Sequence, residues 1–383
     1  MDKNKRIAIL SVTNDLTTDQ RVHKVALSLM KSGYTPILIG RKLKKSIPIE
    51  RRNYLTKRLK LFFTRGPFFY AEYNLRLFFY LLFSKYNLLI SNDLDSLLAN
   101  YLVYKIKAVI FKKNVNLVYD SHEFFTEVPE LTGRLVKRVW LLIEKMILPH
   151  LKHAYTVCQS IADEYEKRYG LKMFVVRNVP ICDRVVYEPQ SFNLLTKEYS
   201  YKRIILYQGA LNIGRGIEQT IKAMKYIENT IFLIVGDGDI AHELKKLVKN
   251  ENLNKKVRFI GKIPFRDLAA YTQIADIGII LLESELSLNY HFALPNRIFD
   301  YIQAELPIIA SNLPEISKIV SGNDIGILVS DMIPENLAKE INNLLKDQNR
   351  YQQIKANLKS IKEKYCWEQE EKKLLELFHA FGR

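Results

Sequence analysis

The stretch that decides the fold reads Asn289-Tyr-His-Phe-Ala-Leu-Pro-Asn-Arg-Ile-Phe-Asp-Tyr-Ile-Gln-Ala-Glu-Leu-Pro-Ile-Ile-Ala-Ser311. The apolar run before it, Ile277 to Leu282, has the length and β-branching of a buried strand. Pro295 and the Asn after it form a stop-and-cap signal, which predicts a helix that starts at about Arg297. Leu306-Pro307 ends this helix, and the apolar residues that follow start another buried strand. This order of elements is typical of an α/β domain.

In an open α/β sheet, the loop after a strand and the start of the next helix form the usual ligand crevice. Free backbone N–H groups at that helix start, together with Arg297, suit a pyrophosphate. Asp300 lies one turn further into the helix, where its carboxylate can accept two hydrogen bonds from a ribose diol. The pattern therefore predicts a nucleotide diphosphate site that includes Asn296, Arg297 and Asp300. An ordinary helix start in an α/β domain is the alternative.

The segment Pro295-Asn-Arg-Ile-Phe-Asp-Tyr301 resembles the donor loop of retaining glycosyltransferases of family four, which have the GT-B fold. It is similar to the subset that reads Pro-Asn-Lys-hydrophobic-Phe-Glu-Tyr. Arg297 stands in place of the Lys, and Asp300 stands in place of the second Glu of the family's Glu-x7-Glu pair. The first Glu of that pair would fall at Phe292, so one carboxylate that holds the donor sugar in the family is absent.

The 383 residues are enough for two α/β domains with separate cores. The three cysteines, Cys158, Cys182 and Cys366, form no Cys-x-x-Cys motif and no even framework, which favours a reduced cytosolic protein. The start of the chain has the character of a first strand rather than of a signal peptide. No apolar run reaches about eighteen residues, so we expect no membrane-spanning helix.

The positive charge is concentrated in the first half of the chain. Of the formal net charge of +17, residues 1–190 carry +15, from 32 basic and 17 acidic residues. The remaining residues contain 26 basic and 24 acidic side chains. An excess of positive charge that is confined to one half of the chain indicates a surface for a polyanionic partner, either nucleic acid or anionic lipid.

The segment from Arg41 to Lys85 holds twelve of these basic residues and only two acidic ones, interleaved with three aromatic and aliphatic clusters. Such a mixture predicts a helix or helical hairpin that lies on an anionic membrane surface. A core-facing helix with a solvated basic face is one alternative, and a single-stranded nucleic acid site is another. We expect no nucleic acid partner, because no recognisable nucleic-acid-binding module accompanies the segment.

The first domain opens with two predicted strands, residues 6–12 and 36–40, around a helix from Gln20 to Ser32. The turn before this helix lacks a Gly-rich phosphate loop, so we do not expect the nucleotide in this half. Asp19 is either a helix cap or, by the family resemblance, a residue that faces the acceptor. A later segment, Tyr119-Asp-Ser-His-Glu123, resembles the family's histidine motif. The resemblance implies that His122 lies beside the donor sugar in the interdomain cleft, although a structural histidine is the alternative.

The second domain opens with a strand that leads through a loop with three glycines into a helix at Ile217. The resemblance implies that Arg215 clamps the diphosphate and that Gly209 and Gly214 lie against the donor. It also places the loop of Gly236 and Gly238 under the diphosphate or ribose, although plain turn glycines are the alternative. The residue after Phe259-Ile-Gly-Lys262 is Ile263, which we expect to contact the base through its backbone.

The motifs together favour an α/β chain of two Rossmann-like domains that face a cleft. The predicted parts are an acceptor-side domain (1–185) with the basic segment 41–85, a nucleotide-sugar-binding domain (201–365), and a final helix (366–383) that packs back toward the first domain. The predicted activity is retaining transfer of a sugar, of hexosyl type, from a nucleotide diphosphate donor to an acceptor hydroxyl. We expect His122, Arg215 and Arg297 to be catalytic and no metal or cofactor to be required.

We expect the acceptor to be a glycan or lipid-linked molecule of the cell envelope, and the protein to be cytoplasmic and peripheral at the inner face of the cell membrane. Two alternatives remain for the function. The first is a nucleotide-sugar 2-epimerase, which shares the GT-B architecture. The second is a non-catalytic protein that binds sugar nucleotides, since the absence of the first Glu allows it.

Overall fold

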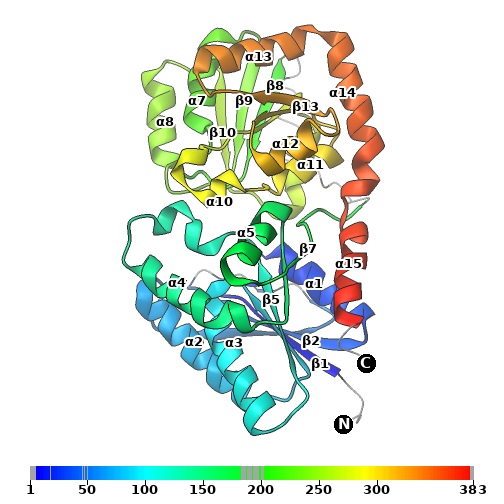
Figure 1. Ribbon diagram of the computed structural model, residues 1–383. Helices are drawn as coiled ribbons and strands as arrows, with labels where there is room; N and C mark the ends of the chain where they lie inside the picture. The colour runs from blue at the N-terminus through cyan, green and yellow to red at the C-terminus, as the bar shows by residue number, and fades with distance from the viewer. Residues whose placement is uncertain are drawn as a thin grey trace. The chain divides into compact units, whose positions relative to one another are not determined.

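The computed structural model describes residues 6–379 except Thr18, Lys45, Ile47, Glu50, 183–186, 188–191, 193–197 and 200–201. The chain forms two compact units, which Figure 1 shows with their elements labelled. Unit 1 contains residues 1–178 and 370–383, and unit 2 contains residues 179–369. The chain therefore passes from one unit to the other at two places, after Asn178 and after Gln369.

Unit 1 has a parallel sheet of seven strands in the order β3-β2-β1-β4-β5-β6-β7. Its strands are β1 (Arg6–Ser11), β2 (Tyr34–Lys42), β3 (Leu55–Lys60), β4 (Leu88–Asn92), β5 (Asn116–Ser121), β6 (His153–Thr156) and β7 (Phe174–Val175). Its α-helices are α1 (Gln20–Lys31), α2 (Gly66–Phe83), α3 (Leu94–Lys105), α4 (Val136–Ile147) and α5 (Gln159–Tyr169). The helix α15 (Trp367–His379) begins in unit 2 and continues in unit 1.

The helices α2 and α3 cover one face of this sheet, because their apolar residues join a core cluster with Ile9, Ile39 and Leu89 of the strands. The helix α1 begins where the side chain of Asp19 accepts a hydrogen bond from the Val22 N–H, so Asp19 is a helix cap. Glu371 of α15 accepts hydrogen bonds from Ser28 and Lys31 of α1, both at 2.6 Å.

Unit 2 has a parallel sheet of six strands in the order β10-β9-β8-β11-β12-β13. Its strands are β8 (Arg203–Gln208), β9 (Thr230–Val235), β10 (Val257–Gly261), β11 (Ile277–Ile280), β12 (Ile308–Ser311) and β13 (Gly326–Val329). Its remaining α-helices are α7 (Ile217–Ala223), α8 (Ala241–Asn250), α9 (Leu268–Gln273), α10 (Leu288–His291), α11 (Arg297–Gln303), α12 (Pro314–Val320), α13 (Pro334–Lys346) and α14 (Gln348–Ile361).

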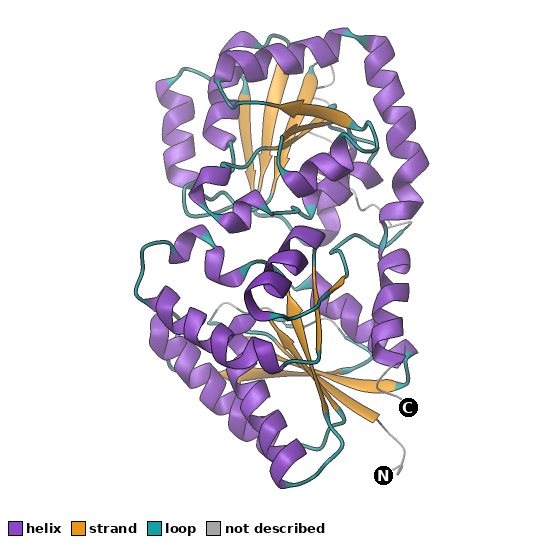
Figure 2. Cartoon of the chain, in the orientation of Figure 1, coloured by secondary structure: helices purple, strands orange, loops and turns teal. Residues whose placement is uncertain are grey.

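In both units a parallel sheet is enclosed by helices, as Figure 2 shows. The prediction of two Rossmann-like α/β domains is therefore confirmed. The helix predicted at Arg297 also begins at that residue. No helix among the described residues is long and apolar enough to span a bilayer.

The sequence predicted that segment 41–85 forms one helix or a helical hairpin, and the structure differs from this prediction. Its residues Leu55–Lys60 form β3, which pairs in parallel with β2 at the edge of the sheet. Among the described residues of the segment only α2 is helical, and it buries Phe69, Tyr73, Leu77 and Leu81 in the core of unit 1. The prediction missed β3 because four of its six residues are polar or charged, which is typical of an edge strand.

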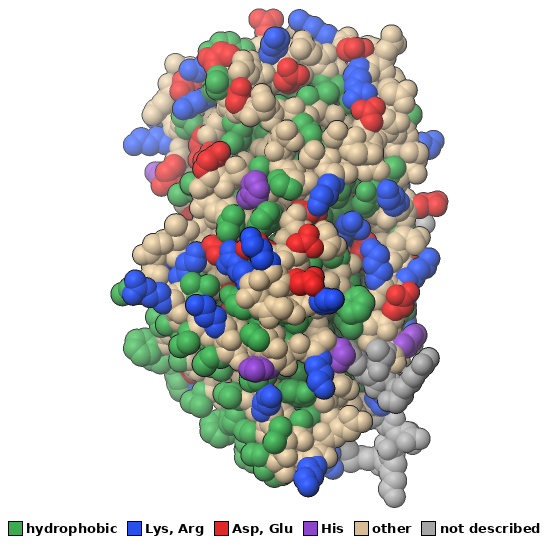
Figure 3. All heavy atoms as spheres, viewed as in Figure 1, with side chains coloured by type: hydrophobic (Ala, Val, Ile, Leu, Met, Phe, Trp, Pro, Cys, Tyr) green, Lys and Arg blue, Asp and Glu red, His purple; other side chains and the backbone are tan. Residues whose placement is uncertain are grey.

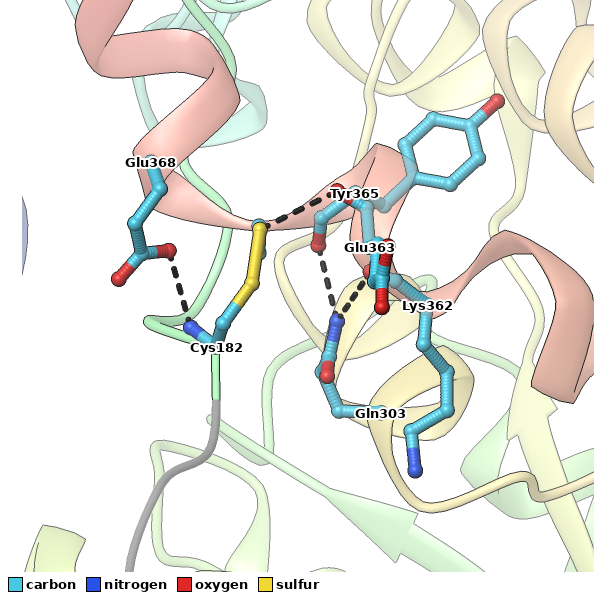
Figure 4. The surroundings of a disulfide bond; sticks show 7 residues. Cys182, Gln303, Lys362, Glu363, Tyr365 and Glu368 are labelled. Atoms are coloured by element: carbon cyan, nitrogen blue, oxygen red, sulfur yellow. Dashed lines mark hydrogen bonds between the residues drawn. A yellow bond between two sulfur atoms is a disulfide. The ribbon is translucent and has the colours of Figure 1, made fainter.

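The prediction that all three cysteines are reduced is wrong. Cys182 and Cys366 form a disulfide, whereas Cys158 is buried and is not part of a disulfide. The two chain segments run side by side there, because the Trp367 N–H donates to the Pro180 carbonyl and the Cys182 N–H donates to Glu368 (Figure 4). The pair is separated by 184 residues, so no local spacing pattern could indicate it. A cytosolic location therefore no longer follows from the cysteine content.

Candidate active site

Arg297 lies at the start of α11 in unit 2 and is only 6 % exposed. Its guanidinium lies over the ring of Tyr207, 4.5 Å from the centroid, and Nη1 lies 3.4 Å from the Gln208 carbonyl oxygen. Its Nε and Nη2 atoms are buried and have no hydrogen-bond partner within the described part of the chain. Because a buried cation with unused donors is costly, this arrangement indicates a place for an anion.

Asp300, one turn further along α11, is held by a buried residue that the motifs did not indicate. Gln208, at the end of β8, donates from Nε2 to Asp300 Oδ2 at 3.0 Å. The Thr272 hydroxyl of α9 donates to Gln208 Oε1 at 2.8 Å, which fixes the orientation of the amide. Gln208 is a positioning residue for the Asp300 carboxylate. The only sequence feature that could have indicated Gln208 is its position as a polar residue directly after the apolar run Ile204–Tyr207.

Arg215 lies in the loop between β8 and α7 and is half-buried. Its guanidinium carbon lies 5.5 Å from the centroid of the Tyr290 ring, and its Nε atom is buried without a hydrogen-bond partner in the described residues. Asn296 precedes α11 and is exposed, and its side chain makes no capping hydrogen bond. Ile263 lies in the loop after β10 and is half-buried.

The four candidate glycines lie in loops that approach one another closely. A Cβ atom on Gly236 would lie 1.9 Å from the Gly209 carbonyl oxygen, and one on Gly238 would lie 2.4 Å from that of Leu211. A Cβ atom on Gly214 would lie 2.2 Å from the side chain of Leu286. These contacts give Gly214, Gly236 and Gly238 a packing role whether or not a ligand is bound. Gly209 differs, because its missing side chain faces Arg297 Nη1 at 3.3 Å.

A pocket of about 570 Å³ lies elsewhere in unit 2. It is lined by His291 of α10 and by residues at both ends of α12, among them Asn312, Ser317 and Lys318. Neither Arg297 nor Asp300 lines it. The pocket therefore does not coincide with the anion site that the sequence predicted.

His122 of unit 1 directly follows β5 and lies between two carboxylates. Its Nδ1 atom is 3.3 Å from Asp93 Oδ2, and its Nε2 atom is 3.1 Å from Asp120 Oδ2. The His122 backbone N–H also donates to Asp93 Oδ1 at 2.8 Å. Asp120 is fully buried and pairs with Arg21, whose Nη2 atom lies 2.7 Å from Oδ1. The side chain of His122 remains 19 % exposed.

The charges of this network determine its protonation. Burial alone would lower the pKa of His122, but the carboxylates of Asp93 and Asp120 overcome this effect and raise it to about 10. Burial also opposes ionisation of Asp120, but Arg21 and His122 lower the pKa of this carboxyl to about 2. Burial raises the pKa of Asp93 to about 7, so this carboxyl titrates near neutral pH, whereas His122 is an imidazolium there. Because both ring nitrogens of the imidazolium carry a proton, it has no lone pair with which to remove another.

Asp93 and Asp95 lie at the start of α3, next to His122. Asp93 has φ 59° and ψ 167°, a left-handed conformation that costs free energy in a residue other than glycine. Burial raises the pKa of Asp95 to about 6, and its Oδ1 atom has no hydrogen-bond partner in the described residues. Strained backbone and buried carboxylates at the carboxyl ends of β4 and β5 are features of a functional site.

We expect Asp93→Asn to lower the pKa of His122, because the substitution removes one of the two anions that favour the charged imidazole. NMR titration of the histidine ring protons measures this change. In the unsubstituted protein His122 should remain protonated from pH 6 to 8, whereas His153, whose pKa is lowered by burial, serves as an internal control. A wild-type His122 that titrates near its ordinary value of 6.5 would contradict the network.

The same network predicts how stability depends on pH. The folded-state pKa of His122 lies above its ordinary value of 6.5. The contribution of His122 to the free energy of unfolding is therefore fully present below about pH 6.5, and it is lost as the pH rises through about 10.

Comparisons with known proteins cover both units. Residues 19–179 match the family model Glycosyltransferase Family 4, and residues 196–360 match the model Glycosyl transferases group 1. The uncharacterized glycosyltransferase MJ1178 of Methanocaldococcus jannaschii is 23 % identical over 286 residues, which are 70 % of this chain and 77 % of that protein.

Two solved structures share the fold over nearly the whole chain. Sucrose-phosphate synthase from Thermosynechococcus elongatus has a TM-score of 0.79 at 19 % identity, and 98 % of each chain is covered. Anabaena Alr3699/HepE in complex with UDP-glucose has a TM-score of 0.73 at 13 % identity, covering 98 % of this chain and 99 % of that chain.

These matches support a transferase of the GT-B fold. The two family models, which match neighbouring parts of the chain, support a glycosyltransferase of the group 1 kind. They do not favour the epimerase or the non-catalytic binding protein.

Proposed function

We propose that the chain transfers a hexosyl group from a nucleotide diphosphate sugar to an acceptor hydroxyl with retention of configuration. The observation that carries the proposal is the buried guanidinium of Arg297 at the start of α11, whose Nε and Nη2 have no hydrogen-bond partner among the described residues. Arg215 contributes a second guanidinium with a buried, unused Nε in the same unit. Two such groups suit the oxygens of a diphosphate and would stabilise the charge that develops on it during transfer.

In the proposed donor complex, Asp300 accepts hydrogen bonds from the ribose hydroxyls while Gln208 holds its other oxygen. Asn296 and Gly209 lie next to Arg297 and are proposed donor contacts, as is Ile263 for the base. The structural neighbour Alr3699/HepE, which was solved with UDP-glucose, supports a donor of this class. We propose no metal and no cofactor, because the two arginines supply the positive charge that the diphosphate requires.

In the proposed reaction the acceptor hydroxyl attacks the anomeric carbon of the donor sugar. A new C–O bond forms as the bond between the sugar and the phosphate breaks, and the hydroxyl proton passes to the departing phosphate oxygen. The protonation of His122 supports this route, because an imidazolium held by Asp93 and Asp120 cannot act as the base. We propose that His122 instead places positive charge beside the transferring sugar.

The acceptor is proposed to be a glycan or lipid-linked molecule of the cell envelope. The proposed location is cytoplasmic, at the inner face of the cell membrane, with unit 1 in contact with anionic lipid through segment 41–85. The helix α2 supports this contact, since Phe68, Leu75, Phe79 and Phe83 are exposed along it.

We expect Asp300→Asn to weaken binding of the donor nucleotide by about 1–3 kcal/mol, because a charged acceptor for the ribose hydroxyls is lost. Isothermal calorimetry with UDP, GDP and ADP measures the effect on the nucleotide that binds. Asp347→Asn is a matched control in the same unit, since Asn caps α14 as well as Asp does. Equal affinity of the Asp300→Asn variant and the wild type, with both folded, would remove Asp300 from the site.

A further inference from the structure

Exposed apolar side chains are concentrated on one part of unit 1. Fourteen of the 23 large hydrophobic residues that are exposed in the described chain lie between residues 62 and 146. In α2 the exposed residues Phe68, Leu75, Phe79 and Phe83 recur at a spacing of seven or four residues, opposite the residues that α2 buries in the core. The helix therefore has one apolar side toward the core and a second apolar side toward the solvent.

The helix α4 repeats this arrangement outside the basic segment 41–85. It buries Trp140, Ile143 and Ile147 toward the core of unit 1. Its solvent side carries Leu135, just before the helix, Val139, Leu142 and Met146, which are between 49 % and 76 % exposed. Because these residues are three or four positions apart, they form one stripe along the helix.

The end of α3 joins the two helices into one surface. The π-helical turn Ile106–Ile110 follows α3, and Val109, Ile110 and the adjacent Phe111 are all more than half exposed. Tyr70 of α2 contacts Trp140 of α4 edge-on, with ring centroids 5.1 Å apart. Figure 1 shows α2, α3 and α4 beside one another, and Figure 3 shows hydrophobic side chains gathered over them. We call the exposed side of these three helices the helical face.

The exposed charged residues around the helical face are mostly basic. Between residues 61 and 146, nine Lys and Arg side chains are exposed, against two acidic ones, Glu123 and Glu130. The exposed charges on the helices themselves are Arg76 of α2, Lys105 of α3, and Arg138 and Lys145 of α4. Apolar side chains between basic ones are complementary to an anionic bilayer, in which acyl chains lie beneath negative headgroups.

We infer that the helical face is a two-helix membrane-docking surface on which α4 contributes as much as α2, and that its partner is an anionic lipid bilayer. Val139 and Leu142 enter the upper acyl region, while Arg138 and Lys145 remain with the headgroups. The protein lies on the bilayer rather than across it, since no described helix can span one. The inference rests on the membrane contact proposed above for segment 41–85 and extends it to α3 and α4, whereas it does not depend on the transfer reaction.

The test is flotation of the full chain with phosphatidylcholine vesicles, with and without phosphatidylglycerol. We expect binding to the anionic vesicles to exceed binding to the neutral ones by about tenfold or more, and to weaken in 1 M salt. The double variant Val139→Ser/Leu142→Ser should lower binding by about tenfold or more, because two apolar anchors are lost. Tyr226→Ser/Ile333→Ser is the matched control, since these unit 2 residues are similarly exposed, at 49 % and 52 %.

Unchanged binding of the α4 double variant would overturn the inference, and so would equal binding of the wild type to neutral and anionic vesicles. A wild-type dimer that the α4 substitutions dissociate in sedimentation velocity, with no vesicle binding, would show that a second copy covers the face. Donor hydrolysis, assayed without vesicles, should be unaffected by the α4 substitutions. If the wild-type protein showed no donor hydrolysis, this result would count against the proposed function but not against the membrane-docking surface.

Discussion

Replacing Arg297 with Ala should lower the turnover of sugar transfer by about 10²- to 10³-fold, the usual effect of removing one group that stabilises transition-state charge. Arg297 is buried, stacks on Tyr207, and keeps Nε and Nη2 free for an anion. Its loss would leave the developing charge on the diphosphate without its nearest counter-ion. Arg297→Lys should restore only part of the activity, because an ammonium lacks the planar fork that binds two phosphate oxygens.

The matched control is Arg203→Ala, at the other end of β8. Arg203 is about half exposed and pairs with Asp276 at 2.7 Å, an ion pair expected to contribute little. Steady-state kinetics with the same donor compare the two variants, and thermal unfolding checks that both are folded. If Arg297→Ala lost no more activity than Arg203→Ala, the diphosphate would not lie at α11.

Replacing His122 with Ala should lower transfer by about 10²-fold or more, the usual scale for a positioned catalytic group. The substitution removes the imidazolium between Asp93 and Asp120, and it leaves Asp93 without its cation. His122→Gln should remain impaired, because an amide restores a hydrogen-bond donor but not the charge. His122 itself should not titrate between pH 8 and pH 6, so a change in wild-type activity over that range would come from another group, such as Asp93, whose pKa is raised by burial to about 7.

His153→Ala is the control for this variant, because His153 begins β6 at the opposite end of the sheet of unit 1. Product formation by each variant is measured after circular dichroism has confirmed the fold. Wild-type turnover in a folded His122→Ala protein would make His122 a structural residue of the Arg21–Asp120 network.

Local patterns predicted the regular elements well. The alternation of apolar strands and amphipathic helices indicated the parallel sheets, and Pro295-Asn296 located the start of α11 at the correct residue. The end of α3 cannot be read from the sequence, because the apolar residues Ile106–Phe111 continue a helical pattern while the chain takes a π-helical turn at Ile106–Ile110. The sequence also did not indicate that one set of apolar residues of α4 faces the solvent. The periodicity of apolar residues does not distinguish a stripe that is exposed from a stripe that packs against the core.

Contacts between distant residues were beyond prediction from one sequence. The support of Asp300 by Gln208 and Thr272, and the clamp of His122 by Asp93 and Asp120, each join different strands and helices. The Cys182–Cys366 disulfide depends on the return of the chain after α14. Such partners carry no fixed spacing, so only the three-dimensional structure shows them.

The most direct test is hydrolysis of nucleotide sugars by the purified full chain. A panel of UDP-, GDP- and ADP-linked hexoses is incubated with the protein, and release of the nucleoside diphosphate and the anomeric form of the freed sugar are followed by NMR. We expect one base to be preferred and the sugar to be released initially with the anomeric configuration of the donor. Release of no nucleoside diphosphate from any donor by the folded protein, or release with inverted configuration, would contradict the proposed retaining transfer.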